Sequence, residues 1–187
     1  MRVGLIAGEG NFPLEVAQSI SQKNIEVFIV ALKNIASKDI ERYPHIWVRM
    51  GQIGKAIQAL KENNCEELIL IGGVKKPNVW LLKPDFGALK LFFKLVMLPS
   101  KGDASILKTL LQFLEIDNKF KVVGAEKYIP HLLMSEGLLA GEKIDKQTQI
   151  DIDIAIANCI NIGFKDIGQA CVVVNGAVSY THLTLPT

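Results

Sequence analysis

The sequence predicts an α/β protein: a Rossmann-like parallel sheet domain followed by the incomplete start of a second α/β domain. Short apolar runs alternate along the chain with segments of helical period, which is the pattern of βαβ units. The runs at residues 27–30 and 68–71 contain only apolar residues. Strands of this composition are typical of a sheet that helices cover on both faces.

The first domain is expected to extend over residues 1–130. We expect its strands at residues 2–7, 26–31, 46–50, 67–71 and 120–123, and its helices at residues 14–22, 53–63 and 104–114. Glycine-bearing loops follow three of these strands, and in a parallel sheet such loops meet at one edge, where ligands bind. The loops are therefore the first place to look for a site.

A second domain is expected to begin at residue 131. A turn region at residues 137–141, a helix at residues 148–162 and an apolar strand at residues 171–174 indicate its start, and we place it at residues 131–177. Residues 178–187 resemble a translated sequencing adapter, so we expect a non-native tail from Val178 onwards. On that interpretation the strand at residues 171–174 has no strand to pair with.

Composition narrows the class of protein. The chain has 187 residues, 49% of them hydrophobic and 21% charged, with a net charge of +2, which favours a folded protein and gives no support for a nucleic-acid partner. It runs from Met1 directly into a strand without an apolar signal segment, so we expect a cytoplasmic location. The three cysteines lack metal-ligand spacing and are expected to be inert core thiols; they are Cys65, Cys159 and Cys171.

The loop at residues 8–13 follows the first strand and opens a helix, where backbone N–H groups and the helix dipole favour an anion. It supplies the candidate substrate-binding residues Gly8, Gly10 and Asn11. Pro13 stands where a dinucleotide-binding loop needs its third glycine, so a nicotinamide or flavin cofactor is disfavoured. The alternative is a tight turn with Pro13 at the helix start.

Three further loops supply the other candidate substrate-binding residues, which are Gln52, Gly72, Lys75, Lys101 and Asp103. Gln52 could hydrogen bond to a base, sugar or amide, unless the glycines around it only relieve crowding. Lys75 follows a glycine pair and could bind phosphate, or it could belong to a solvated lysine pair. Asp103 could meet a metal, but its place before a helix also fits an N-cap.

The segment at residues 88–98 reads as an amphipathic helix with Lys90 and Lys94 on one face. Such a helix could lie in a membrane interface or line an acyl pocket. Burial in the core is the alternative.

Five segments together resemble the LpxI-type UDP-2,3-diacylglucosamine pyrophosphatases in order and spacing: residues 4–13, 51–55, 72–77, 101–103 and 166–170. The resemblance covers residues 1–177. It implies a hydrolase of lipid A biosynthesis, in which water attacks the pyrophosphate of UDP-2,3-diacylglucosamine to give UMP and 2,3-diacylglucosamine 1-phosphate. It also implies a divalent metal, Mg²⁺ or Mn²⁺, that offsets phosphate charge and activates the water.

The resemblance further implies a lipid-linked nucleotide sugar as substrate and a cytoplasmic, peripheral position on the inner membrane of a Gram-negative bacterium, and it is compatible with a homodimer. The family continues after Gly176 into an acidic stretch where this chain has its adapter-like tail. We therefore expect a C-terminally truncated chain without catalytic residues, and we assign no metal ligand. Two alternatives remain open: the nucleotide-sugar-binding domain of a glycosyltransferase-like enzyme, and a non-catalytic ligand-binding module.

Overall fold

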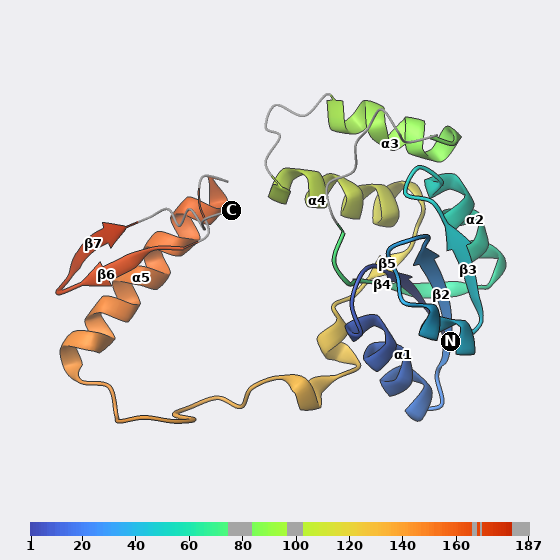
Figure 1. Ribbon diagram of the computed structural model, residues 1–187. Coiled ribbons are helices and arrows are strands. Elements are labelled where there is room, and N and C mark those ends of the chain that lie inside the picture. The colour runs from blue at the N-terminus through green and yellow to red at the C-terminus, as the bar shows by residue number, and fades with distance from the viewer. Residues whose placement is uncertain (75–83, 97–102, 166–167, 169, 181–187) are drawn as a thin grey trace. The chain divides into compact units, whose positions relative to one another are not determined.

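The computed structural model describes residues 1–74, 84–96, 103–165, 168 and 170–180 (Figure 1). Contacts divide the chain into two units. Unit 1 contains Met1–Lys101 and Ile106–Met134, and unit 2 contains Gly102–Ser105 and Ser135–Thr187. The domain limits expected from the sequence remain predictions, and each unit is described by itself.

Unit 1 is built on a five-stranded sheet in the order β3-β2-β1-β4-β5, with all neighbouring strands parallel. The strands are β1 (Arg2–Ala7), β2 (Glu26–Leu32), β3 (His45–Val48), β4 (Cys65–Ile71) and β5 (Lys121–Val122). This is the order of the first five strands in a doubly wound α/β sheet. The predicted α/β fold is therefore confirmed.

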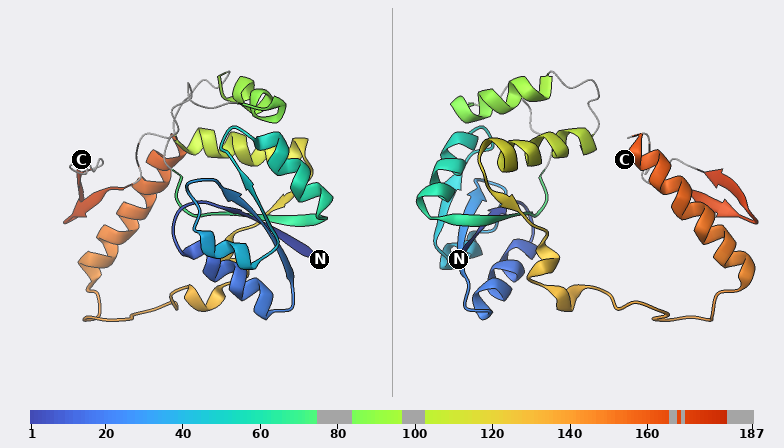
Figure 2. Two further views of the ribbon diagram at one scale, coloured as in Figure 1. Left: turned by 45° about the vertical axis from the view of Figure 1, so that its right-hand side comes forward. Right: turned by 180° about the vertical axis from the view of Figure 1, so that it is seen from behind.

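Helices cover both faces of this sheet, as the two views of Figure 2 show. They are α1 (Phe12–Gln22), α2 (Ile53–Glu62) and α4 (Asp103–Gln112), while α3 (Phe86–Val96) packs against α2. Shorter helical segments lie at Lys38–Arg42, Phe113–Asp117, Ala125–Lys127 and Pro130–Leu132. The sequence had predicted the helix after β4 only as an amphipathic segment, and it begins at Phe86.

Alternation along the strands sorts the core into two layers. Leu5 and Ile29 belong to the cluster that also contains α1 residues such as Ile20. Val30 and Leu68 belong to the other cluster, which includes residues of α2 and α3. Buried side chains on both faces explain why these strands are nearly unbroken apolar runs.

Unit 2 contains the helix α5 (Lys146–Phe164) and a hairpin of β6 (Val172–Val174) and β7 (Ala177–Tyr180). The expectation that the first of these strands has no partner is wrong, because β7 pairs with it and draws its last residues from the expected non-native tail. Asn175 and Gly176 both have positive φ, at 51° and 78°. An Asn-Gly pair in this conformation is the favoured two-residue hairpin turn.

The cysteines differ from one another. Cys65 is buried, and burial raises its pKa to about 11, as expected for an inert core thiol. The expectation is wrong for Cys159 and Cys171, which are half-buried with their Sγ atoms 3.4 Å apart. Within the described residues, no helix combines the length and the apolar character needed to cross a membrane.

The buried carboxylate of Glu67, on β4, holds the end of unit 1 against the sheet. It accepts hydrogen bonds from Lys121 Nζ at 2.9 Å, from Tyr128 Oη at 2.8 Å and from Lys127 Nζ. The bond from Lys127 outweighs the opposing effect of burial and, with the other two donors, lowers the pKa of Glu67 to about 2. The carboxylate therefore stays ionised through the neutral range.

We expect Glu67→Gln to lower the free energy of unfolding at pH 7 by about 1.5–3 kcal/mol, because it removes the charge that these donors bind. The folded-state pKa of about 2 lies below the ordinary value of 4.5, so this stabilisation is complete above pH 4.5 and is lost as pH falls towards 2. In urea unfolding, the difference in unfolding free energy between wild type and Glu67→Gln should be smaller at pH 3 than at pH 7. The control is Glu66→Gln, which changes the exposed neighbour of Glu67. An equal loss of unfolding free energy in both variants would contradict the role of Glu67.

Candidate ligand-binding site at the carboxyl ends of the strands

The loops after β1 and β4 contact each other directly through their backbones. Gly8 N donates to Ile71 O at 2.8 Å, and Glu9 and Gly73 exchange two backbone hydrogen bonds of 2.8 and 3.0 Å. A Cβ atom on Gly8 would lie 2.5 Å from the carbonyl oxygen of Gly73, so no larger residue fits there. Gly72 has φ +97°, in the region that favours glycine. We call this contact the glycine lock.

The glycine lock changes the interpretation of the first loop. The amides of Gly8, Glu9 and Gly73 already donate to carbonyl oxygens and are not free to cradle a phosphate. Pro13 lies in the first turn of α1, as the tight-turn alternative required. Asn11 precedes α1, but its side chain makes no capping hydrogen bond.

A pocket of about 430 Å³ lies beside the glycine lock in unit 1. Its walls are apolar and come from the sheet, from α2, and from α4 with the helical turn that follows. They include Ile6, Val30, Leu70, Ile57, Leu60 and Leu110. The volume falls within the range of small-molecule sites.

The rim of this pocket is polar where β3 ends. Arg49 and Gln52 line it together with Gly8 and Gly72 of the glycine lock. The Gln52 side-chain oxygen accepts from Arg49 N at 2.9 Å, and Gln52 N donates to Arg49 O at 2.8 Å. Arg49 was not among the residues singled out in the sequence. The sequence placed Arg49 inside the strand expected at residues 46–50, whereas β3 ends at Val48 and leaves Arg49 at the sheet edge where ligands bind.

Asp85 joins the starts of α2 and α3. Its carboxylate accepts from the backbone amides of Gly54 and Lys55 at 3.0 Å each and from Ala88 at 2.8 Å. Burial opposes its ionisation, but these amide hydrogen bonds prevail and lower the pKa of Asp85. A Cβ on Gly87 would lie 2.6 Å from Gly54, so these two glycines relieve crowding between the helices. Sequence reasoning missed this double cap, because its partners are distant along the chain.

The structure brings only part of the predicted substrate-binding set together. Gly8, Gln52 and Gly72 line the pocket, whereas Gly10 and Asn11 do not. Lys75 and Lys101 lie outside the described residues, and Asp103 begins α4 with its side chain outside them. The assignment of these residues to substrate binding remains a prediction.

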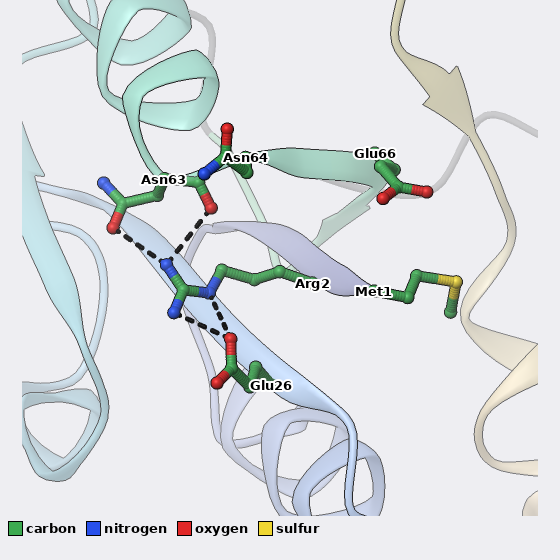
Figure 3. A pocket seen from close by; sticks show the side chains of 6 residues that line it. All are labelled: Met1, Arg2, Glu26, Asn63, Asn64 and Glu66. Atoms are coloured by element: carbon green, nitrogen blue, oxygen red, sulfur yellow. Dashed lines mark hydrogen bonds and ion pairs between the residues drawn. The ribbon is translucent and has the colours of Figure 1, made fainter.

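A smaller pocket of about 190 Å³ lies at the amino ends of the strands, where Arg2 occupies the centre (Figure 3). Arg2 Nε donates to Glu26 at 2.9 Å, and Arg2 Nη1 donates to the backbone oxygen of Asn63 at 3.1 Å. These groups are satisfied by one another, so the feature is structural. Among the described residues, no group of three or more His, Cys, Asp or Glu could hold a metal ion.

One side of α3 is exposed and apolar, while Ala88 and Leu91 on its other side are buried. The exposed apolar residues of α3 are Phe86, Leu89, Phe92 and Phe93, which we call the α3 face. Lys94 Nζ lies 2.6 Å from a carboxylate oxygen of Asp117, and Lys90 Nζ lies 4.0 Å from the same atom. The helix is thus partly core and partly exposed, between the two alternatives that the sequence left open.

The fold and the pocket define an α/β protein with a candidate ligand site at the carboxyl ends of a parallel sheet. Residues 2–132 match the family model of the LpxI N-terminal domain, and the chain belongs to this family. Over 177 residues it is 31% identical to the UDP-2,3-diacylglucosamine pyrophosphatase LpxI of Caulobacter vibrioides. The aligned part is 95% of this chain and 63% of that relative, so the chain spans less than two thirds of the relative's length.

Proposed function

We propose that this chain is the substrate-binding part of a hydrolase that cleaves the pyrophosphate of UDP-2,3-diacylglucosamine. The products would be UMP and 2,3-diacylglucosamine 1-phosphate, in lipid A biosynthesis. Membership of the LpxI family supports this proposal, and the Caulobacter relative is a UDP-2,3-diacylglucosamine pyrophosphatase. The observation that carries it in the structure is an apolar pocket with a polar rim at the edge where the strands end.

The pocket suits a substrate that is partly lipid and partly polyanion. Such a molecule needs apolar walls for its chains and a few placed polar groups for its head. The walls include Leu60, Leu70 and Leu110, and the rim carries Arg49 and Gln52. A nucleotide alone would leave most of these walls without a partner.

We assign no catalytic residue in this chain. The described residues present no ligand set that fits the expected Mg²⁺ or Mn²⁺. This chain's own part in the reaction is to bind and orient the substrate and to exclude water from its apolar portion. Lys75, which follows the strand end after Gly72, is proposed as a further phosphate contact on its position in the sequence.

The proposal is tested by comparing this 187-residue chain with a full-length family member that contains it. We expect the longer protein to release UMP from UDP-2,3-diacylglucosamine without any acceptor sugar, and the shorter chain to bind the substrate without releasing UMP. Nucleotide products are separated and quantified in the presence of Mg²⁺, Mn²⁺ or EDTA. Release of UDP only when an acceptor is added would indicate a glycosyltransferase-like enzyme. Binding without turnover in both proteins would indicate a non-catalytic module.

We also propose that the α3 face contacts the cytoplasmic surface of the inner membrane, where the substrate's acyl chains reside. Exposed aromatic and aliphatic side chains beside lysines are suited to a membrane interface. Phe92 and Phe93 are 46% and 59% exposed, so they are available for insertion. Asp117 reduces the net positive charge of Lys90 and Lys94, so apolar contact is the larger contribution.

We expect the double substitution Phe92→Ser, Phe93→Ser to weaken binding to vesicles of phosphatidylglycerol and phosphatidylcholine by at least about tenfold, because each buried phenylalanine contributes about 1.5–3 kcal/mol. Sedimentation with the vesicles measures the bound fraction. The matched control is Leu132→Ser, Leu133→Ser, which changes two exposed apolar residues of unit 1 that lie outside α3. If the control loses as much binding as the α3 variant, the α3 face is not the contact surface.

A further inference from the structure

The apolar pocket is too large to be a packing defect. Protein interiors contain few voids larger than a water molecule, yet here about 430 Å³ stays open between the sheet and α4. The side chains that surround it, such as Val30, Leu70 and Leu110, offer no hydrogen bond to water. An apolar group is the occupant that these walls favour.

Among the described residues that line the pocket, Arg49 is the charged one. The chain contains three arginines. Arg2 pairs with Glu26 at 2.7 Å and Arg42 pairs with Asp39 at 3.4 Å. Within the described part of the chain, the exposed guanidinium of Arg49 makes no hydrogen bond or ion pair, although Arg49 lines the pocket.

The backbone around Arg49 is held in place. Gln52 binds both the amide and the carbonyl of Arg49, which closes the turn between β3 and α2. The guanidinium therefore extends from a defined point on the rim, next to the glycine lock. Glu9 belongs to the glycine lock. In the part of the chain that the structure describes, it forms no ion pair with Arg49.

We propose that the pocket binds one acyl chain of a phosphate-bearing lipid, with Arg49 binding the phosphate at the rim. A guanidinium matches phosphate oxygens with two parallel hydrogen bonds, which distinguishes this head group from a neutral one. That this lipid is the substrate UDP-2,3-diacylglucosamine rests on the proposed function. Binding of the chain and its phosphate does not require the uridine, so it can be measured separately from hydrolysis.

Dodecyl phosphate is the probe, titrated calorimetrically into the 187-residue chain below the concentration at which the probe forms micelles. We expect saturable binding by wild type and a loss of about 10–100-fold in affinity for Arg49→Ala, from the loss of a charge-assisted contact. Arg42→Ala is the matched control, because it removes another exposed arginine that does not line the pocket, and it should bind as wild type does. Equal affinities of wild type and Arg49→Ala would overturn the role of Arg49.

The apolar half of the proposal has its own variants. Ala56→Phe and Leu107→Phe place a larger side chain on the pocket wall, and both should abolish binding. Leu107 is 52% exposed, so its variant should fold even if Ala56→Phe does not. Undiminished binding by folded Leu107→Phe, or no saturable binding by wild type, would overturn the acyl site.

Competition identifies the source of the lipid. We expect UDP-2,3-diacylglucosamine to displace dodecyl phosphate. If phosphatidylglycerol displaces the probe and UDP-2,3-diacylglucosamine does not, the substrate is not the lipid that occupies the pocket. The UMP assay remains separate from these titrations. Hydrolysis by the Arg49→Ala variant of the full-length protein at the wild-type rate and KM would overturn this inference while leaving the proposed function intact.

Discussion

The contact between the loops that follow β1 and β4 is the constraint on which the site depends. These strands are neighbours at the centre of the sheet, and their ends approach so closely that Gly8 meets the carbonyl of Gly73 with no room for a side chain. The amides on both sides are used to hold the loops together. The glycines of the first loop thus close the edge of the sheet, and a ligand must find its polar partners elsewhere on the rim.

The polar groups of the rim lie where β3 ends, beside an apolar interior. The pocket walls come from the sheet, α2 and α4, which also contribute to one of the two core clusters, so the pocket is an opening in the core of unit 1. Asp85 fixes the start of α2 to the start of α3 and so keeps one wall in position. An apolar interior with a cation at its rim suits a lipid that carries phosphate, which agrees with membership of the LpxI family.

Most of the fold followed from the sequence, because periodicity reports burial: the central strands of unit 1 are buried on both faces and are accordingly nearly unbroken apolar runs. What could not be predicted depends on contacts between distant segments. Asp85 reads as an ordinary loop acid until α2 is placed beside it, and Arg49 reads as a strand residue until its lack of an acidic partner is seen. The hairpin in unit 2 was missed although its Asn175-Gly176 turn is a local signal, since the following residues were set aside as a tail.

The glycine lock holds the edge of the sheet together, and the unfolding free energies of Gly8→Ala and Gly73→Ala are the measurement that tests this contact. A Cβ at Gly8 would meet backbone at 2.5 Å, whereas one at Gly73 would meet Glu9 Cβ at an ordinary 3.6 Å. In urea unfolding we expect Gly8→Ala to lose about 1–3 kcal/mol, as overpacked sites do. Gly73→Ala should stay within about 0.5 kcal/mol of wild type. Equal stability of the two variants would contradict the account.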